Sequence, residues 1–496
     1  MHANFHEPGV AAFPGEPPAM PLPATEPARH AGRRIQITMS PYYGRPDFSQ
    51  LLEGLPRPLD RVSVADLLRN GFVYPPHSVY EDVKVVTYGF SPMQDMHEQP
   101  EFRYRFRDIN KSRRTRHENL DWVGQYHRLL CGAVARSCSD IRSPWLLQSG
   151  GKDSTPLAIA ASEVRPETTC ITYLGGTEED EVASASYVAR RLGLRHETLI
   201  CDPARAYDRY LAIVPRMPLL TADFALLSYI DLVTEISISG GDGVIDGMGS
   251  DSYFGLSVDR THRVLSSLAR GWRLPAFLSM LPFVQNSFPL CYLLSTLQME
   301  RIERTFPGSR FTDEEVDELF GRDASVLSRK RLELYQDELA SAYTVDEWFA
   351  IAMSVAGSAA GFAKGLLSSS ALSMRPAYPF CDSDLRDWVY REVPRELLVD
   401  PITRANKVLV RDHIATRFEK LPYVSRKGSF RFDLRGLART RFDHVYGLAR
   451  DVRHVLPGAV RWLDRNRGRL DNKYHASKFY LLAVVMPWIA HHGGGD

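Results

Sequence analysis

Apolar and polar positions follow a strand–helix repeat through the middle of the chain. Short apolar runs predict strands at residues 144–148, 168–175, 196–200 and 242–247. Apolar residues with the 3.6-residue period of a helix lie between them, at 154–163, 182–194 and 219–235. Strands that alternate with helices form a parallel sheet with helices on both faces. In such a sheet, ligands bind at the carboxyl ends of the strands.

The flanking regions have other patterns. Residues 1–34 are rich in Pro, Ala and Gly without apolar periodicity, which predicts a disordered tail. Residues 35–115 contain the alternating runs "DVKVVTYGF" and "EFRYRFRDI", which predict a small β-rich region. Residues 116–496 form the third predicted part, which begins with an amphipathic helix at Trp122–Cys138 and is mostly helical beyond Thr261.

Composition indicates a globular protein with balanced charge. The 496 residues carry 61 basic and 60 acidic side chains, so nothing indicates bulk nucleic-acid binding. Six scattered cysteines form no CxxC pair, so neither a zinc site nor a disulfide framework is indicated, and a cytoplasmic protein fits best. The apolar run 348–367 contains Ser354, Ser358 and Lys364, which favours a buried helix over a membrane span.

The first strand of the repeat runs into "SGGKDST" at Ser149–Thr155. Glycines let the backbone approach a bound group closely, and a helix start favours negative charge. Lys152 adds a positive charge, and Asp153 is a candidate metal ligand. The alternative is a plain turn capped by Asp153 or Ser154. This loop alone does not decide between the two.

A second loop, "DGMGSDSYFG" at 246–255, follows the fourth strand. If the two strands are neighbours, Asp153 and Asp251 face one site. Two carboxylates beside a phosphate-binding loop suit Mg²⁺ bound to a nucleoside triphosphate. Taken alone, Asp251 would be a helix N-cap or an Asx turn. The pairing of the two loops favours the metal site.

Five segments resemble, in the same order, motifs of the asparagine synthetase-like N-type ATP pyrophosphatases. "SGGKDST" resembles the SGGxDS pyrophosphate loop, and "DGMGSDSYFG" resembles the second loop, commonly SGEGSDELFGG. The others are "SMRPAYPFCDSDLRDWV" (373–389), "TRANKVLVRDHI" (403–414) and "SRKGSF" (425–430). They cover the chain from about residue 116 onward. The resemblance implies an α/β fold of the adenine nucleotide alpha hydrolase type, with a parallel sheet flanked by helices.

The resemblance also implies that ATP and Mg²⁺ bind at the two loops. The residues that it places around ATP are Ser149, Gly150, Gly151, Asp153, Ser154, Thr155, Tyr173, Leu174 and Gly247. The loop residues would hold the pyrophosphate end, and Tyr173 and Leu174 would flank the adenine. Asp153 and Asp251 would hold Mg²⁺.

Two lysines are implied as catalytic. Lys407 matches the family's lysine that stabilises negative charge during adenylation or amide formation. Lys427 would reach the same phosphates. From the residues alone, Lys407 is an ordinary exposed helix lysine whose replacement changes stability little. Arg375, in the third segment, is interpreted as structural.

The implied reaction joins a small-molecule or peptide carboxylate to an amine or ammonia. The carboxylate attacks the α-phosphate of ATP and forms an acyl-adenylate with release of pyrophosphate, and the amine then displaces AMP. Neither nucleic acid nor a membrane is expected as a partner, and a homodimer is left open.

Two departures from the family bear on the substrate. Glutamine-using members have a catalytic cysteine after the initiator Met, whereas position 2 is His, so residues 35–115 are interpreted as a non-catalytic glutaminase remnant. Met248 stands where the family often has Glu or Tyr, and Met cannot act as a base. A ligase of specialised metabolism is therefore favoured over asparagine formation.

Other functions remain as alternatives. A non-catalytic ATP-binding scaffold is favoured by Met248, and a macrolactam or lasso-peptide cyclase is a ring-closing version of the same chemistry. The retained Ser149, Asp153, Asp251 and Lys407 favour an enzyme. A sulfur-transfer or nucleobase-modifying enzyme would need clustered cysteines or a basic RNA-binding face, and the sequence shows neither.

Overall fold

A computed structural model describes most of the chain. The described residues are 35–52, 57–92, 102–106, 121–175, 181–254, 278, 281–306, 311–421 and 432–494. The chain divides into two units, of which Arg34–Asp496 holds all of these residues. The predicted tail at residues 1–34 and the predicted catalytic residue Lys427 lie outside the described residues.

A five-stranded parallel sheet organises the part of the chain that contains the two loops. Its strands are β5 (Pro144–Leu147), β6 (Thr169–Leu174), β7 (Arg195–Ile200), β8 (Gly243–Ile245) and β9 (Arg375–Ala377). Their order is β7-β6-β5-β8-β9, and every neighbouring pair is parallel. The four predicted strands are confirmed. The sequence analysis missed β9, because three residues with a central proline show no apolar period.

The strand order reverses beside β5. From β5 the chain moves outward through β6 to β7 and then returns to the other side of β5 as β8. Leu146 is therefore in register with Cys170 on one side and with Ile245 on the other. The loops that follow β5 and β8 consequently start at the same edge of the sheet. Such reversals are where open α/β sheets bind ligands.

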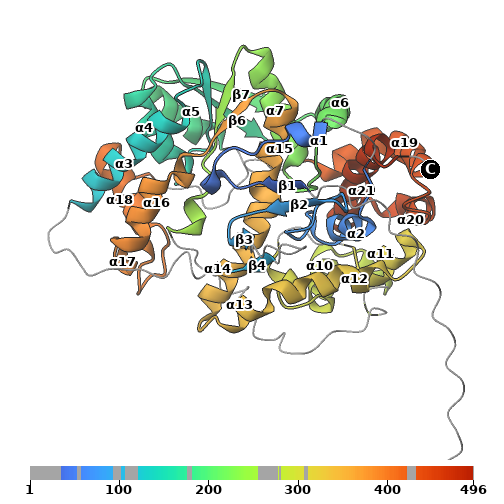
Figure 1. The fold of residues 1–496 in the computed structure, drawn as a ribbon. Helices are drawn as coiled ribbons and strands as arrows, with labels where there is room; N and C mark the ends of the chain where they lie inside the picture. Colours follow the sequence, from blue (N-terminus) through green and yellow to red (C-terminus); the bar gives the residue numbers. More distant parts are fainter. Residues whose placement is uncertain are drawn as a thin grey trace, which may run out of the picture. The chain divides into compact units, whose positions relative to one another are not determined.

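Helices cover both faces of the sheet (Figure 1). On one face lie α3 (Trp122–Ser137), α4 (Ser154–Val164), α5 (Val182–Arg191) and α18 (Val408–Arg417). On the other lies α7 (Leu226–Ile238), with α15 (Ala363–Ala371) packed against it. Leu146 and Ile245 contribute to the first hydrophobic cluster, whereas Trp145 and Val244 contribute to the second. This alternation of side chains along each strand buries the sheet on both faces and confirms the predicted fold class.

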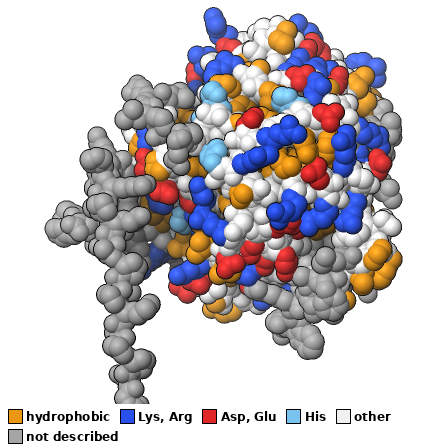
Figure 2. Space-filling view, turned by 90° about the vertical axis from the view of Figure 1, so that its right-hand side faces the viewer, with side chains coloured by type: hydrophobic (Ala, Val, Ile, Leu, Met, Phe, Trp, Pro, Cys, Tyr) orange, Lys and Arg blue, Asp and Glu red, His pale blue; other side chains and the backbone are white. Residues whose placement is uncertain are grey.

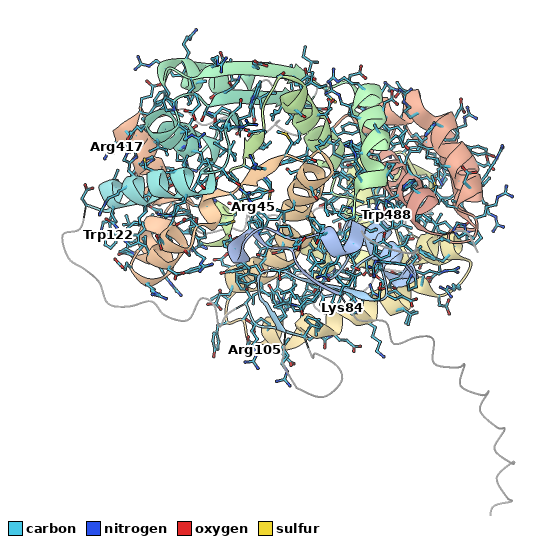
Figure 3. The ribbon with its side chains drawn as sticks, turned by 45° about the horizontal axis from the view of Figure 1, so that its top comes forward. Arg45, Lys84, Arg105, Trp122, Arg417 and Trp488 are labelled. Atoms are coloured by element: carbon cyan, nitrogen blue, oxygen red, sulfur yellow. The ribbon has the colours of Figure 1, made fainter. Side chains whose placement is uncertain are left out.

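The chain beyond residue 261 is mostly helical among its described residues, as predicted. Helix α6 (Pro203–Ile213) precedes this part. The further helices within it are α9 (Pro282–Gln285), α10 (Phe288–Gln298), α11 (Asp313–Phe320), α12 (Ala324–Lys330), α13 (Gln336–Ala340), α14 (Val345–Ala356), α16 (Ser383–Arg391), α17 (Arg395–Leu398), α19 (Leu434–Asp451), α20 (Ala459–Asn466) and α21 (Lys473–His492). Helix α21 is almost wholly buried, and its Trp488, labelled in Figure 3, donates its indole N–H to the carbonyl oxygen of Met217 at 3.2 Å.

One apolar helical stretch is long enough to be compared with a membrane-spanning helix. Val345–Ala371, which joins α14, a π-helical turn at Gly357–Phe362 and α15, has the length and composition to cross a membrane. However, 72% of its apolar window is buried inside the protein. The expectation of a buried helix agrees with this packing.

On the face shown in Figure 2, basic, acidic and apolar side chains are interspersed.

The N-terminal part contributes short strands and one substantial helix. Strand β1 (Ile35–Thr38) pairs in parallel with β2 (Val83–Val86), and β3 (Phe90–Pro92) pairs antiparallel with β4 (Phe102–Tyr104). The helices of this part are α1 (Ser49–Leu52) and α2 (Arg61–Asn70). A small β-rich region is thus present, and its origin as a glutaminase remnant stays a prediction.

A buried ion pair attaches α2 to the C-terminal helical part. The guanidinium of Arg69 lies 2.9 Å from a carboxylate oxygen of Glu303, and both side chains are almost fully buried. Arg69 also donates to Ser328 at 3.1 Å, and Tyr74 donates its hydroxyl to Glu303 at 3.0 Å. A carboxylate oxygen of Asp313 lies 3.2 Å from the same guanidinium. Since the Glu303 carboxylate is desolvated, it depends on Arg69 for compensation of its charge.

We expect Arg69→Met to lower the free energy of unfolding by about 3–5 kcal/mol, because the Glu303 carboxylate would stay buried without its partner. Urea denaturation followed by tryptophan fluorescence measures this loss. The matched control is Arg439→Met, which removes an arginine whose pair with Asp471 is largely exposed and should cost less than about 1 kcal/mol. Equal losses in the two variants would contradict the proposed role of the buried pair.

Candidate functional site

The two loops predicted to form a site do come together. Because β5 and β8 are adjacent and parallel, the loop that begins at Ser149 and the loop that contains Asp251 leave the same edge of the sheet. The hydroxyl of Ser250, in the second loop, donates to the carboxylate of Asp153, in the first, at 2.9 Å. The predicted pairing of Asp153 with Asp251 is therefore supported by direct contact between their loops.

Lys407 joins both carboxylates. Its ammonium lies 2.6 Å from Asp251, forms an ion pair with Asp153 and donates to the Ser250 hydroxyl at 2.8 Å. The lysine side chain is completely buried. The expectation of an ordinary exposed helix lysine is wrong, since the tertiary fold brings residue 407 under two loops that lie more than 150 positions earlier.

The backbone at Lys407 is also unusual. Its φ of 58° and ψ of 44° lie in the left-handed region, which disfavours residues with a Cβ. It is the N-cap of α18, where the helix dipole disfavours a positive charge. A hydrogen bond of 2.6 Å from its N–H to the carbonyl of Leu398 holds this conformation. Strain at one residue that carries a buried charge is typical of functional sites.

Electrostatics decides the charge state of this lysine. Burial opposes its ammonium form, but Asp251 and then Asp153 favour that form more strongly, so the pKa of Lys407 is raised above its usual value. The side chain is consequently a cation at neutral pH. A fixed positive charge thus lies between two carboxylates at the reversal point of the sheet.

The first loop is closed by its own hydroxyl groups. The backbone N–H of Ser149 donates to the Ser154 hydroxyl at 3.1 Å, and the N–H of Gly151 donates to the Ser149 hydroxyl at 3.3 Å. Gly150 has a φ of 66°, and a Cβ there would lie 2.9 Å from the backbone nitrogen of Ala185. Glycine is required at this position both for its conformation and for the close approach.

The alternative interpretation of the first loop, a plain turn capped by Asp153, is wrong. Asp153 occupies the N-cap position of α4, but its side chain makes no capping hydrogen bond and instead contacts Lys407 and Ser250. The N-terminus of α4 is therefore not neutralised by its own cap residue. Similarly, Asp251 lies within a short helical turn whose N-cap is Gly249, so it is not an N-cap either.

Beside these charged groups is a cavity of about 330 Å³. Its polar wall includes five of the predicted residues, namely Ser149, Asp153, Ser154, Gly247 and Asp251. Its apolar wall is formed by Tyr88, Phe106, Leu147, Met248, Ala350, Met353 and Phe362. The apolar side chains come from the N-terminal part, the end of β5, the loop after β8, and the long helix around its π-helical turn. Such turns occur frequently at functional sites.

Comparison with known proteins shows which family the chain belongs to. The family model described as asparagine synthase matches residues 125–444, which is more than half of the chain. The chain belongs to the asparagine synthase family. This family consists of ATP-using carbon–nitrogen ligases. A comparison with curated proteins finds no match.

Solved structures with some similarity include two synthetases. One is an NH3-dependent NAD synthetase from Campylobacter jejuni subsp. jejuni NCTC 11168, with 14% identity, coverage of 47% of this chain and 92% of that chain, and a TM-score of 0.22. The other is an NMN synthetase from Francisella tularensis, with 17% identity, coverage of 44% and 93%, and a TM-score of 0.20. These low scores carry no argument about function.

Four of the predicted residues are placed elsewhere or not described. The Tyr173 side chain is buried in the hydrophobic cluster beside α7, and Leu174 ends β6, so neither lines this cavity, and their contact with adenine stays a prediction. The Thr155 hydroxyl is buried without a hydrogen-bond partner. Lys427 lies outside the described residues. Arg375 donates to the carbonyl of Asp140 at the amino end of the sheet, as expected for a structural residue.

The sequence analysis missed Asp246, which stands where the family's second loop commonly has Ser. It lines the cavity at the carboxyl end of β8, and its carboxylate accepts the N–H of Met248 at 3.0 Å. Burial raises the pKa of Asp246, and Lys364 partly opposes the rise. The Lys364 ammonium lies 3.9 Å from the Met248 sulfur and 3.7 Å from Asp223. The position of Asp246 directly after an apolar strand was a signal available in the sequence.

The residues present fit Mg²⁺ and ATP. Asp153 and Asp251 lie close enough together to contact the same Lys407 ammonium. Carboxylate oxygens are also preferred ligands of Mg²⁺. The uncapped start of α4 and the hydroxyls of Ser149 and Ser154 suit the phosphates. Asp153, Asp251 and these loop groups are the residues that would hold the metal and the triphosphate.

We expect Lys407→Met to lower the free energy of unfolding by about 1–3 kcal/mol, because Asp153 and Asp251 would face each other without the ammonium. Asp153→Asn should be destabilising alone but should recover part of the loss when it is combined with Lys407→Met. A double-mutant cycle measured by urea denaturation tests the contact. Strictly additive effects would show that the two side chains do not interact.

Proposed function

We propose that the protein is an ATP-dependent ligase that converts a carboxylate into an acyl-adenylate, releases pyrophosphate and transfers the acyl group to an amine or ammonia. The observation that carries the proposal is the buried Lys407 ammonium, which contacts Asp153 and Asp251 beside the loop that starts α4. Folding has to overcome desolvation, a left-handed backbone and an unfavourable helix dipole to place this charge there. A requirement of the chemistry explains why the charge is kept.

The roles of the residues follow from their positions. The backbone N–H groups at the start of α4, with the Ser149 and Ser154 hydroxyls, bind the departing pyrophosphate. Bound Mg²⁺ supplies neutralisation of phosphate charge, and Asp153 and Asp251 hold it. Lys407 stabilises the negative charge that develops at the reacting phosphorus or carbon, which lowers the barrier because the charge is already oriented.

The cavity lining supports an apolar acid as the substrate. Tyr88, Phe106, Met248, Met353 and Phe362 provide aromatic and thioether surface, and no Lys or Arg occurs among the described lining residues. A second substrate carboxylate, such as that of aspartate, would therefore lack a basic partner in the lining. A monocarboxylic acid with an apolar acyl part fits better, in agreement with a role in specialised metabolism.

Asp246 is the proposed base for the incoming amine. Met248 cannot accept a proton, but the neighbouring Asp246 carboxylate lines the same cavity, and its raised pKa makes it a better proton acceptor than an ordinary aspartate. Met248 thus stands where the family often has Glu or Tyr, and the Asp246 carboxylate lies two positions earlier. A non-catalytic scaffold would need neither Asp246 in the cavity nor the strained Lys407.

ATP should be converted to AMP and pyrophosphate when a substrate acid is present. The reason is that the loop at the start of α4 binds the two terminal phosphates, which leave together as pyrophosphate. Nucleotide products can be resolved by chromatography across a panel of apolar monocarboxylic acids, with aspartate as the control acid. ADP as the main nucleotide product would refute the assignment.

Lys407→Met should reduce turnover by a factor of about 10²–10³, the usual effect of removing one group that stabilises transition-state charge. ATP affinity should fall much less, because the contact is strongest in the transition state. Pyrophosphate release and ATP binding are measured side by side at a temperature where the variant is folded. Unchanged pyrophosphate release in the presence of a turned-over acid would remove Lys407 from the mechanism.

The pH profile should identify the base. A base acts when deprotonated, so kcat/KM should fall as the pH drops through the raised pKa of Asp246, above the usual value of about 3.9 for aspartate. Asp246→Asn should remove this acid limb and slow the reaction by about 10²–10⁴. Asp242→Asn, at the other end of the same strand, is the matched control and should keep the limb. An unaltered limb in Asp246→Asn would assign it to another group.

A further inference from the structure

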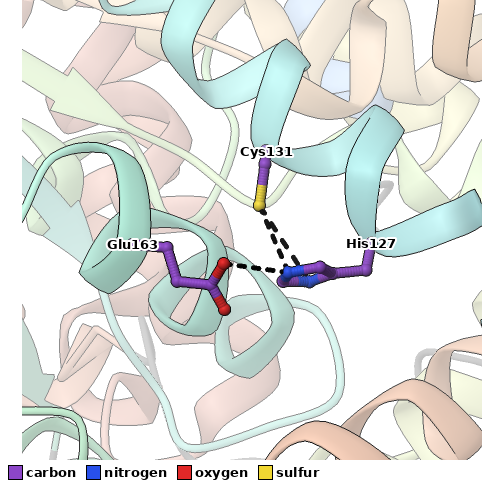
Figure 4. Close-up of side chains that lie close together, drawn as sticks. All are labelled: His127, Cys131 and Glu163. Carbon is purple, nitrogen blue, oxygen red and sulfur yellow. Dashed lines mark hydrogen bonds and ion pairs between the residues drawn. The ribbon is translucent and has the colours of Figure 1, made fainter. Parts of the chain in front are cut away.

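Three side chains with metal-binding atoms converge between α3 and α4. His127, Cys131 and Glu163 each place one such atom within 4.8 Å of the others, and we call them the α3–α4 cluster. Figure 4 shows His127 and Cys131 on one helix, with the carboxylate of Glu163 reaching toward them from the next. The i, i+4 spacing puts the imidazole and the thiol on the same face of α3. The cluster takes no part in the site described above.

Two separations within the cluster lie within about 0.4 Å of those around a tetrahedral metal ion. The Nε2 atom of His127 lies 3.6 Å from the Cys131 sulfur and 3.0 Å from the Glu163 oxygen. With usual zinc bond lengths and tetrahedral angles, the corresponding separations are about 3.5 Å for nitrogen and sulfur and about 3.4 Å for nitrogen and oxygen. Small adjustments of side-chain rotamers would therefore bring all three atoms into bonding range of one ion.

Hydrogen bonds to Glu163 and His413 use both ring nitrogens of His127 and leave the Cys131 sulfur, 3.6 Å from Nε2 and 4.0 Å from Nδ1, without a ring position of its own. The Nε2 atom of His127 has one lone pair or one N–H, yet both Cys131 and Glu163 approach it. Its other nitrogen, Nδ1, already forms a hydrogen bond of 3.0 Å with Nε2 of His413. This second bond orients the ring as outer partners do in metal sites, because it leaves Nε2 directed at the other two groups.

We propose that His127, Cys131 and Glu163 form a zinc site, with His413 as the residue that orients His127. Imidazole, thiolate and carboxylate together suit Zn²⁺ better than Mg²⁺, which prefers oxygen ligands alone. The half-exposed Glu163 leaves room for water as a fourth ligand. The ligands come from two helices, so cysteine spacing in the sequence could not indicate this site.

The position of the site gives it a structural role toward Lys407. Helix α18 packs against α3 and α4, and it carries His413 six residues after Lys407. Trp122 at the start of α3 and Arg417 at the end of α18 lie on the same flank of the protein in Figure 3. A bound ion would cross-link α3 with α4 and, through His127 and His413, hold the helix whose N-cap is the buried lysine.

The experiment measures metal binding by the full-length protein. After dialysis against a chelator, zinc is titrated by calorimetry, and Co²⁺ is added in parallel to detect thiolate-to-cobalt charge-transfer absorption. We expect one ion per chain, the absorption band, and a melting temperature that rises with zinc, because an ion that binds the folded state stabilises it. Absence of stoichiometric binding would overturn the proposal.

Variants then test the individual ligands. Cys131→Ser should abolish the cobalt band, and Glu163→Gln should weaken zinc binding while the band remains. His413→Asn should weaken binding by about 10–100-fold without removing the band, as expected for an orienting residue. The matched control is Cys201→Ser, another partly exposed free cysteine that lies outside the cluster. A band that survives in Cys131→Ser, or is lost in Cys201→Ser, would assign the binding to another thiol.

Discussion

The contact of the Lys407 ammonium with Asp153 and Asp251 is the interaction on which the candidate site depends. It connects the loops after two adjacent strands with the N-cap residue of α18, and its lysine side chain is fully buried, whereas the Asp251 side chain is largely exposed. A buried charge is tolerated only when its partners compensate the lost hydration, so the three side chains have to be present together. This requirement explains why the N-cap position of α18 holds a lysine in the left-handed conformation, which residues with a Cβ rarely adopt. The strain at one backbone position places a permanent cation at the edge of the sheet where phosphates would bind.

The N-terminal part has a purpose in this structure that does not require glutaminase activity. Tyr88 and Phe106 contribute to the apolar wall of the cavity, and α2 is fastened to the helical part by the buried pair of Arg69 and Glu303. Because the wall consists of segments that are distant in the sequence, its shape depends on how firmly those segments are attached. The selectivity proposed for the acid therefore rests on packing outside the sheet as well as on the loops at its edge.

The loop after β8 places an apolar and an acidic side chain beside the cavity. Met248 approaches Gly361 so closely that a Cβ on that glycine would lie 2.4 Å from the methionine methyl group. The thioether thus fills the space between the loop and the π-helical turn, and the carboxylate of Asp246 reaches the cavity from the strand end. The same turn thus places a thioether at one position and a carboxylate two positions earlier.

The sequence by itself determined four strands with the helices between them and the two glycine-containing loops, and its resemblance to a family made Lys407 a candidate. These features are local, since they follow from apolar periodicity and from short motifs. Only the tertiary structure decided that Lys407 is buried, that the Asp153 side chain does not cap α4, that β9 is an edge strand of the sheet, and that Asp246 lines the cavity. Burial, charge compensation and convergence of side chains depend on which distant segments meet, and a pattern along one chain carries no information about the space between them.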